Sequence, residues 1–312
     1  MALTVLNSTQ EWSAHFGKER STALSVGNFD GLHLGHQRLL NLLVQRSREL
    51  GQRAAVITFD PHPLRLLRPE QAPALLQTLS QRLAGFEQLG VEAVLVLRFD
   101  FALSQIPAEQ FIETILVDCL RAGTILVGEN FCFGHRGAGD VHLLLEYGKT
   151  RPFTVEIVPP VEIGGRVVSS TAVRNAIADG SMSEAMALLG RPFSLTGEIR
   201  PGAGRGRTIQ FPTLNLAPEQ EMLPKLGVYA TESVAAGKTY FSVTNVGTRP
   251  TFGGQGVTVE SHLFNFNELL TAGPMEVRFH ERLRDERKFS GAGELRAQIG
   301  KDAIAARNYF GR

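Results

Sequence analysis

Short apolar runs alternate with stretches of helical periodicity up to about residue 180. The apolar runs are typical of buried strands and cover residues 23–26, 54–59, 93–97, 124–127 and 153–158. Between them, apolar residues recur at the spacing of amphipathic helices, over residues 39–50, 80–89 and 107–120. Strands that alternate with helices predict an α/β fold, with a parallel sheet covered on both faces and ligands at the carboxyl ends of the strands.

The pattern changes at Arg191-Pro192, after a short helical segment over 183–189. Strand-like runs separated by Gly, Pro or Asn turns then follow, at residues 194–200, 227–234, 239–246, 257–266 and 275–284. Strands at this spacing predict a small antiparallel barrel. The chain ends in an expected helix over 294–310, whose inward residues would be Leu295, Ile299 and Ile304. The change of pattern predicts two domains, residues 1–182 and 183–312.

Composition narrows the class of protein. Of the 312 residues, 43% are hydrophobic and 20% are charged, as in an ordinary soluble globular protein. A formal net charge of +1 gives no basic field for nucleic acid. Only two cysteines occur, which suits a reducing compartment, and no apolar run reaches the roughly 20 residues of a membrane span. We therefore expect a cytoplasmic protein with neither nucleic acid nor membrane as a partner.

The segment from Gly27 to His36 carries the first candidate chemistry, because it lies where a predicted strand gives way to a predicted helix. A helix N-terminus attracts phosphate through its unpaired N–H groups and its dipole. Glycines in the turn let backbone amides approach a ligand. His33 and His36 are three residues apart, so both imidazoles can reach one phosphate. As donors they could stabilise the negative charge on a phosphorus under attack.

A zinc site is the alternative interpretation of these two histidines. Zinc needs at least a third protein ligand, which Asp30 or His62 would have to supply. Two unrelated surface histidines are a further alternative. The combination of strand, glycine turn and helix favours phosphate binding over both.

Polar and aromatic side chains gather at three further strand ends, within residues 58–63, 127–134 and 168–174. The first segment places an aromatic ring, a carboxylate and an imidazole at the rim. The second mixes polar groups with aromatic rings, which suits a flat aromatic ligand. The third combines two hydroxyls with a guanidinium at a helix start, which suits a triphosphate. The simpler alternatives are a proline-stiffened loop, phenylalanines that return to the core, and helix N-caps.

The motifs of the first half resemble those of the bacterial bifunctional riboflavin kinase/FMN adenylyltransferases, or FAD synthetases. They read Gly-x-Phe-Asp-Gly-x-His-x-Gly-His, Thr-Phe-x-Pro-His-Pro, Val-Gly-x-x-Phe-x-Phe-Gly and Ser-Ser-Thr-x-x-Arg. The resemblance implies a Rossmann-like nucleotidylyltransferase domain that transfers AMP from ATP to FMN. By matching position, it implies catalytic roles for His33, His36 and Arg174. It implies ATP contacts for Gly27, Phe29, Asp30, Gly35, Ser170 and Thr171, and flavin contacts for Phe59, His62 and Asn130. One departure is Gly137, where many members have an arginine; the nearest here is Arg136.

Three segments of the second half carry candidate chemistry. The loop 202–207 holds glycines and two arginines that could wrap phosphates. Thr213 and Asn215 present oxygens on one side of an extended segment, and Glu260 is a carboxylate in an otherwise apolar strand. Taken singly, these features are as well explained by a hydrogen-bonded turn and a solvated glutamate.

Together with Gly-Val-Tyr, Asn-Val-Gly-x-x-Pro-Thr-Phe and Val-Glu-x-His-Leu-Phe, these segments resemble the riboflavin kinase domain of the same family. That domain is an antiparallel β-barrel ending in a helix. The resemblance implies that Glu260 is the base acting on the ribityl hydroxyl and that Thr213 and Asn215 hold the Mg²⁺ of ATP. It implies ATP contacts for Gly202, Gly204 and Arg205. The expected ligands are riboflavin, FMN, FAD, ATP and Mg²⁺.

Two rival functions are weighed against this hypothesis. A nucleotidylyltransferase with a decayed kinase domain would not need to retain Thr213, Asn215 and Glu260. A flavin-binding regulator without catalysis would have no use for the phosphate-binding residues His33, His36 and Arg174. The sequence favours one chain that makes FMN and then FAD.

Overall fold

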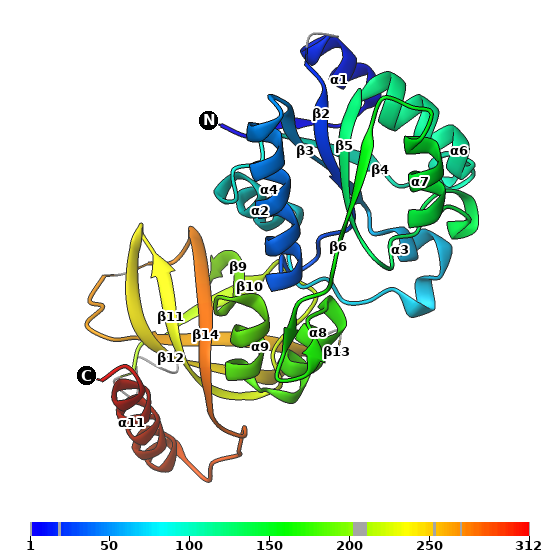
Figure 1. Ribbon diagram of the computed structural model, residues 1–312. Coiled ribbons are helices and arrows are strands. Elements are labelled where there is room, and N and C mark those ends of the chain that lie inside the picture. The colour runs from blue at the N-terminus through cyan, green and yellow to red at the C-terminus, as the bar shows by residue number, and fades with distance from the viewer. Residues whose placement is uncertain (1, 18–19, 202–210, 252–253, 269, 312) are drawn as a thin grey trace. The chain divides into compact units, whose positions relative to one another are not determined.

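The computed structural model describes all residues except 1, 18–19, 202–210, 252–253, 269 and 312. The chain divides into two compact units, Met1–Val168 and Ser169–Arg312 (Figure 1). Helices α8 (Ser170–Asp179) and α9 (Met182–Leu189) pack against each other within the second unit. The compact division thus precedes the domain boundary predicted after residue 182. The boundary between the two activities stays a prediction.

The first unit is built on a six-stranded sheet in the order β1-β4-β3-β2-β5-β6, in which every neighbouring pair is parallel. Its strands are β1 (Thr4–Leu6), β2 (Thr22–Val26), β3 (Arg53–Asp60), β4 (Ala93–Arg98), β5 (Ala122–Gly128) and β6 (Thr154–Val158). The predicted α/β fold is confirmed. The sequence missed β1, since three residues carry too little periodicity to be recognised.

Helices cover both faces of this sheet (Figure 1). Successive strand residues point to opposite faces, so Leu24 joins one buried cluster and Ala23 the other. The first cluster is covered by α1, η2 and α7, and the second by α2 and α4. The helices of the unit are α1 (Thr9–Phe16), α2 (Leu34–Glu49), α3 (Pro63–Leu67), η1 (Pro69–Gln71), α4 (Leu79–Gln88), α5 (Phe101–Ser104), α6 (Ala108–Gln110), η2 (Phe111–Cys119), η3 (His135–Gly137) and α7 (Val141–Gly148). A small hairpin, β7 (Glu162–Ile163) and β8 (Arg166–Val167), precedes Val168.

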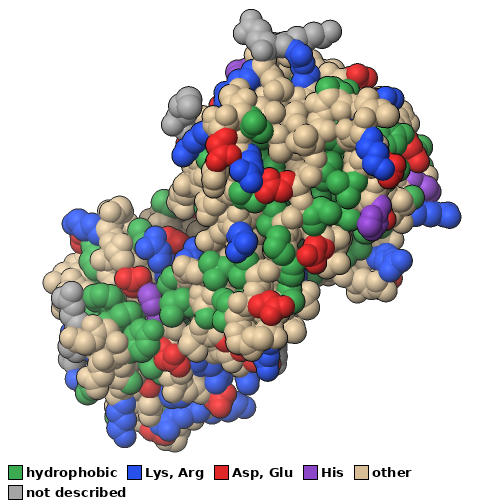
Figure 2. All heavy atoms as spheres, viewed as in Figure 1, with side chains coloured by type: hydrophobic (Ala, Val, Ile, Leu, Met, Phe, Trp, Pro, Cys, Tyr) green, Lys and Arg blue, Asp and Glu red, His purple; other side chains and the backbone are tan. Residues whose placement is uncertain are grey.

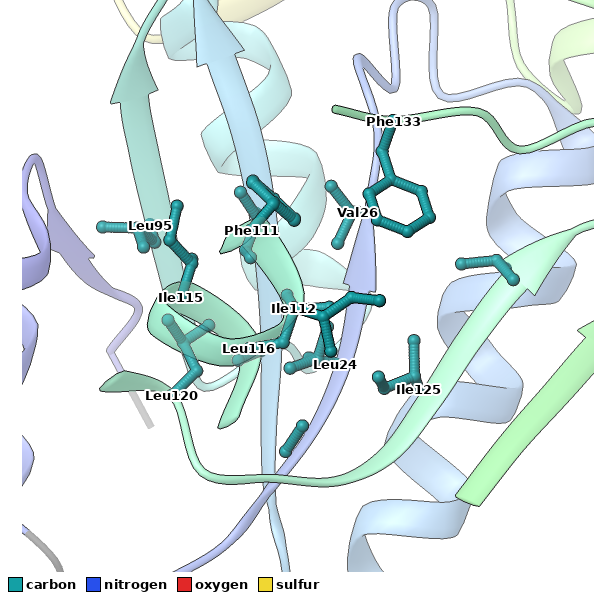
Figure 3. Packing of buried hydrophobic residues seen from close by; sticks show 14 of the residues in the cluster. Leu24, Val26, Leu95, Phe111, Ile112, Ile115, Leu116, Leu120, Ile125 and Phe133 are labelled. Carbon is teal, nitrogen blue, oxygen red and sulfur yellow. The ribbon is translucent and has the colours of Figure 1, made fainter. Parts of the chain in front are cut away.

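The segment after Pro107 corrects one expectation. Instead of a regular α-helix over 107–120, η2 is a π-helix, in which the Leu120 amide donates to the Ile115 carbonyl five residues back at 2.9 Å. The wider turn keeps the predicted apolar face, because Phe111, Ile112 and Leu116 stay buried against the sheet (Figure 3).

The second unit contains a closed six-stranded antiparallel barrel in the order β10-β13-β12-β11-β14-β9. The predicted antiparallel barrel is confirmed, but the sequence indicated only five of its strands and missed the one over residues 214–218. Its strands are β9 (Phe193–Arg200), β10 (Leu214–Pro218), β11 (Gly227–Ala235), β12 (Lys238–Thr251), β13 (Gly254–Leu263) and β14 (Pro274–Arg284). Alternate residues fill its interior, including five buried hydroxyl residues that bond to one another: Thr231, Ser233, Ser242, Thr244 and Ser261. The predicted final helix is α11 (Ala292–Tyr309).

The inward face of α11 differs from the prediction. Ile304 is 61% exposed, whereas Asp302 is only 5% exposed. The Arg284 guanidinium donates to both Asp302 oxygens, at 2.9 and 2.6 Å. Asp302, Ala303 and Ala306 therefore form the buried face of α11, and Ile304 does not belong to it. Hydrophobicity alone could not identify a buried carboxylate whose partner lies on β14.

Charged side chains of both signs are interspersed on the viewed surface (Figure 2). The sequence carries nearly equal numbers of them, 32 Lys and Arg against 31 Asp and Glu. Within the described part of the chain, no helix combines the length and the apolar character needed to cross a bilayer.

Candidate active sites

The turn between β2 and α2 is tightly folded. The Gly27 amide donates to the Ile57 carbonyl at 3.0 Å, and the backbone then takes positive φ at Phe29, Gly31 and Leu32. A Cβ on Gly27 would lie 3.2 Å from the Phe29 ring. That ring is 3% exposed. A contact between Phe29 and ATP, which the sequence predicts, would therefore involve its backbone.

His33 is the N-cap of α2, and its Nδ1 accepts from the His36 amide at 3.4 Å. Because Nδ1 is an acceptor, the neutral ring carries its proton on Nε2. Gly35 leaves room for this ring, since a Cβ there would lie 3.2 Å from it. The cap thus fixes which nitrogen of His33 can donate to a ligand.

His36 stacks on His33, with ring centroids 3.6 Å apart and planes inclined by 21°. Burial, and secondarily the repulsion between the two rings when both are protonated, lower the pKa of His36 well below 6.5. The ring is therefore neutral at pH 7. Its Nδ1 is buried and has no hydrogen-bond partner among the described atoms. As predicted, two imidazoles meet at a helix N-terminus, where amides and ring N–H groups can receive an anion.

The Asp30 carboxylate is bound by the segment before α4. It is buried and accepts from the Leu76 amide at 3.1 Å and from the Gln77 amide at 3.2 Å. His62 is likewise used locally, because its Nδ1 accepts from the Leu64 amide at 3.2 Å and caps α3. In the described ranges, no group of three His, Cys, Asp or Glu side chains could hold a metal ion. The structure gives the zinc interpretation no support.

The predicted flavin-binding residues lie at the same edge of the sheet as the turn. Strands β3 and β5 flank β2, so their carboxyl ends meet there. Phe59 is half-buried at the end of β3 and contacts Phe99 edge-on, with centroids 5.7 Å apart. Asn130 is exposed directly after β5. The Phe59 ring and the Asn130 amide therefore lie at the edge of the sheet formed by the carboxyl ends of β3 and β5.

The loop after β5 returns one aromatic side chain to the core. Phe133 is 7% exposed, stacks on Phe131, and its backbone exchanges two hydrogen bonds of 2.9 Å with Gly139. Gly134 has positive φ, and a Cβ there would lie 2.6 Å from the Ala108 backbone. The simpler alternative, a phenylalanine that returns to the core, therefore holds for Phe133.

Helix α8 presents the third predicted group. Its N-cap is Ser169, whose Oγ accepts from the Ala172 amide at 3.2 Å. Capping therefore falls on Ser169 and not on Ser170 or Thr171, which form the first turn. Arg174 lies half-buried about one turn further along.

Strand register brings the kinase residues together in the barrel. Asn215 on β10 lies directly opposite Glu260 on β13. Both are half-buried, and their neighbours Leu216 and Val259 point into the barrel. Since side chains alternate along a strand, Thr213 is expected on the face of Asn215 and Glu260. Gly202, Gly204 and Arg205 lie outside the described residues.

Two residues of this face were not chosen from the sequence. Asn245 on β12 lies opposite Glu260 on the side away from Asn215. The His262 ring bonds through Nδ1 to the Pro212 carbonyl at 2.9 Å, which ties the segment before Thr213 to β13. Burial lowers the pKa of His262, so the neutral ring is the donor. Asn245 lies within the strand predicted over 239–246, but its place opposite Glu260 depends on the pairing of β12 with β13, which the sequence alone does not give.

Comparison with known proteins assigns both units. A FAD synthetase family model matches residues 16–172, and a riboflavin kinase model matches residues 189–310. A bifunctional riboflavin kinase/FMN adenylyltransferase from Escherichia coli K12 is 38% identical over 294 residues, 94% of each chain. A Bacillus subtilis protein of the same name is 33% identical, again over 94% of each chain. The chain belongs to the bifunctional riboflavin kinase/FMN adenylyltransferase family.

A solved structure is also similar to this family member over nearly its whole length. It is a protein from Streptococcus pneumoniae described as a macrolide-efflux protein, 28% identical, with a TM-score of 0.86 over 99% of both chains. That likeness concerns the fold. The predicted place of the chain in flavin cofactor biosynthesis is confirmed at the level of the family.

Proposed function

We propose that the chain catalyses two consecutive reactions. In the first, riboflavin and ATP give FMN and ADP; in the second, FMN and another ATP give FAD and pyrophosphate. Family membership supports both activities. The observation that carries the residue assignment is the stacked pair of imidazoles at the N-terminus of α2.

Adenylyl transfer would occur at the turn between β2 and α2. An oxygen of the FMN phosphate attacks the α-phosphorus of ATP, and the bond to the β-phosphate breaks, so that pyrophosphate leaves. Negative charge builds up on the α-phosphate and on the leaving group. The Nε2–H of His33, the neutral ring of His36 and the first amides of α2 are donors suited to that charge.

The remaining predicted contacts of this reaction are part of the same proposal. Gly27 and Gly35 would let the backbone approach ATP. Ser170, Thr171 and Arg174 would bind the pyrophosphate portion, because a guanidinium with nearby hydroxyls suits phosphate oxygens. The flavin would lie towards the rim residues Phe59, His62 and Asn130.

Phosphoryl transfer would occur on the barrel face that holds Glu260. Its carboxylate takes the proton of the ribityl primary hydroxyl as that oxygen attacks the γ-phosphorus of ATP and ADP leaves. Gly202, Gly204 and Arg205, in a loop rich in glycine and arginine, would contact the phosphates.

The donor set of this face suits Mg²⁺. Asn215 is paired with Glu260 in register, and Thr213 is two residues from Asn215. A hydroxyl and an amide oxygen are hard donors, and Mg²⁺ takes most of its ligands from phosphates and water. Thr213 and Asn215 would hold the ion, which supplies charge neutralisation on the phosphates.

Product chromatography tests the function. The protein incubated with riboflavin, ATP and Mg²⁺ should yield FMN and then FAD. A flavin-binding regulator would return riboflavin unchanged, and a nucleotidylyltransferase with a decayed kinase domain would make FAD only from supplied FMN. A cytoplasmic location, which cell fractionation would test, stays a prediction.

A further inference from the structure

Arg82 is a buried arginine for which the two reactions provide no role. It lies on α4, and its side chain is 4% exposed. An arginine so thoroughly removed from water needs compensating contacts, because burying an unpaired charge is costly. Burial lowers its pKa, while Asp30 and Asp60 act in the opposite direction. Asp30 follows β2 and Asp60 ends β3, at the edge of the sheet that carries the turn.

The contacts of Arg82 lead directly to the turn. Its Nη1 donates to the Asn28 carbonyl at 2.8 Å and to Thr58 Oγ1 at 3.2 Å. The Thr58 hydroxyl also donates to the Asn28 carbonyl, at 3.4 Å. Asn28 lies between Gly27 and Phe29, so the guanidinium holds the point where the chain leaves β2. Arg82 Nε and Asn28 Oδ1 are buried with no partner among the described atoms.

The same face of α4 holds the turn at further points. Phe86, four residues after Arg82, meets the Phe29 ring edge-on with centroids 5.6 Å apart. Gly85 has no side chain, and a Cβ there would lie 2.2 Å from Cδ1 of Leu32. Residues at i, i+3 and i+4 share one helix face. This face, together with the Asp30 contacts to the segment before α4, therefore fixes the turn residues from 28 to 32.

We propose that Arg82 is a positioning residue for adenylyl transfer: by holding the Asn28 carbonyl, it keeps His33 and His36 where the reacting phosphates need their donors. This inference rests on the proposed function of the turn. Phe29 and Leu32 in the turn have positive φ, a conformation that residues other than glycine keep only when the surroundings enforce it. A guanidinium presents its donors in a rigid planar arrangement, which the donors of an ammonium lack.

The test is the rate of FAD formation from FMN and ATP in Arg82→Met. Methionine keeps a long apolar side chain and removes the donors. Since a displacement of about 1 Å can cost about a hundredfold, we expect kcat to fall about 10- to 100-fold while KM for ATP changes less than about threefold. The acidic limb of the pH–rate profile should also move to higher pH, because a loosened turn hydrates His36 and raises its pKa. A purely structural role would leave that limb in place.

Folding of the first unit is monitored separately. Trp12 is the single tryptophan of the chain and is 1% exposed in the first unit, so its emission maximum reports whether that unit is folded. The matched control is Arg53→Met. Arg53 begins β3, at the opposite edge of the sheet, and its guanidinium lies 3.6 Å above the Phe16 ring. This control should leave kcat for FAD formation within about twofold of the parent value.

Arg82→Met that keeps the Trp12 spectrum and the parent kcat would overturn the inference. If Arg82→Met fails to fold, Thr58→Val decides, because it removes the second acceptor of Arg82. A loss of a few-fold or more in kcat with native Trp12 emission supports the inference, and the parent rate overturns it. His36→Ala is measured in parallel. Full FAD activity in His36→Ala would refute the proposed function of the turn itself, whereas a loss there without one in Arg82→Met refutes only the role of Arg82.

Discussion

In the first unit the two imidazoles lie three residues apart in one turn, whereas in the barrel Asn215 and Glu260 meet only because β10 and β13 pair in one register. The first site depends on local backbone geometry: a cap, two glycines and positive φ angles. The second depends on strand pairing, in which a slip of one residue would turn Glu260 to the other face. The comparison teaches that the two active sites should fail independently and for different reasons.

The largest effect is expected at Glu260. Glu260→Gln keeps size and hydrogen bonding but cannot accept the proton of the ribityl hydroxyl. Loss of a general base commonly costs about 10²- to 10⁴-fold, and we expect riboflavin phosphorylation to fall in that range. FAD formation from supplied FMN should stay at the parent rate. If the variant phosphorylates riboflavin at the parent rate, Glu260 is a solvated strand residue and not the general base.

Separating the units sharpens the comparison further. A fragment from Ser169 to Arg312 should fold alone and phosphorylate riboflavin without making FAD, since it forms one compact unit. A fragment from Ser183 should retain the activity but melt at lower temperature, because it lacks α8, which packs on α9. Circular dichroism melts and kinase assays of both fragments provide the measurement. A folded fragment from Ser169 without kinase activity would show that the first unit contributes to that site.

The ion pair that attaches α11 to β14 should influence the barrel alone. Asp302→Ala leaves the Arg284 guanidinium without its bidentate partner. Breaking a largely buried pair costs up to about 3–5 kcal/mol, and the partial exposure of Arg284 argues for about 2 kcal/mol. Heat inactivation of the kinase should shift to lower temperature. The control is Ile304→Ala, which truncates a largely exposed side chain and should change stability by less than about 0.5 kcal/mol.

The smallest effect concerns pH. The pKa of His36 is lowered in the folded state, so the folded protein resists a proton that the unfolded chain accepts near pH 6.5. The stability from the neutral ring is complete above that pH and is lost as the pH falls below it, by at most about 1.4 kcal/mol per pH unit. Denaturation followed by Trp12 emission at pH 7.5 and 5.5 measures this, and His36→Gln should flatten the difference. An equal slope in both proteins would contradict a neutral buried His36.

The sequence predicts those parts of the candidate sites that lie close together along the chain, and it does not predict contacts between residues that are far apart in the sequence. The strand, glycine turn and helix around His33 and His36 are contiguous, so the sequence identified them together. Contacts with ATP are predicted for Phe29 and Asp30, but the orientation of their side chains depends on α4 and the segment before it, which the sequence of the turn does not give. Arg82 was missed because a lone arginine in a helical pattern is usually solvated. Its partner Asn28 lies 54 residues away.

The most direct test of the account compares both activities in His36→Ala. Loss of one preorganised donor commonly costs about 10²- to 10³-fold, so FAD formation from FMN should fall by that factor. Riboflavin phosphorylation should be unchanged, and Trp12 emission should stay native. FAD formation at the parent rate, or an equal fall in both activities with native Trp12 emission, would contradict the account.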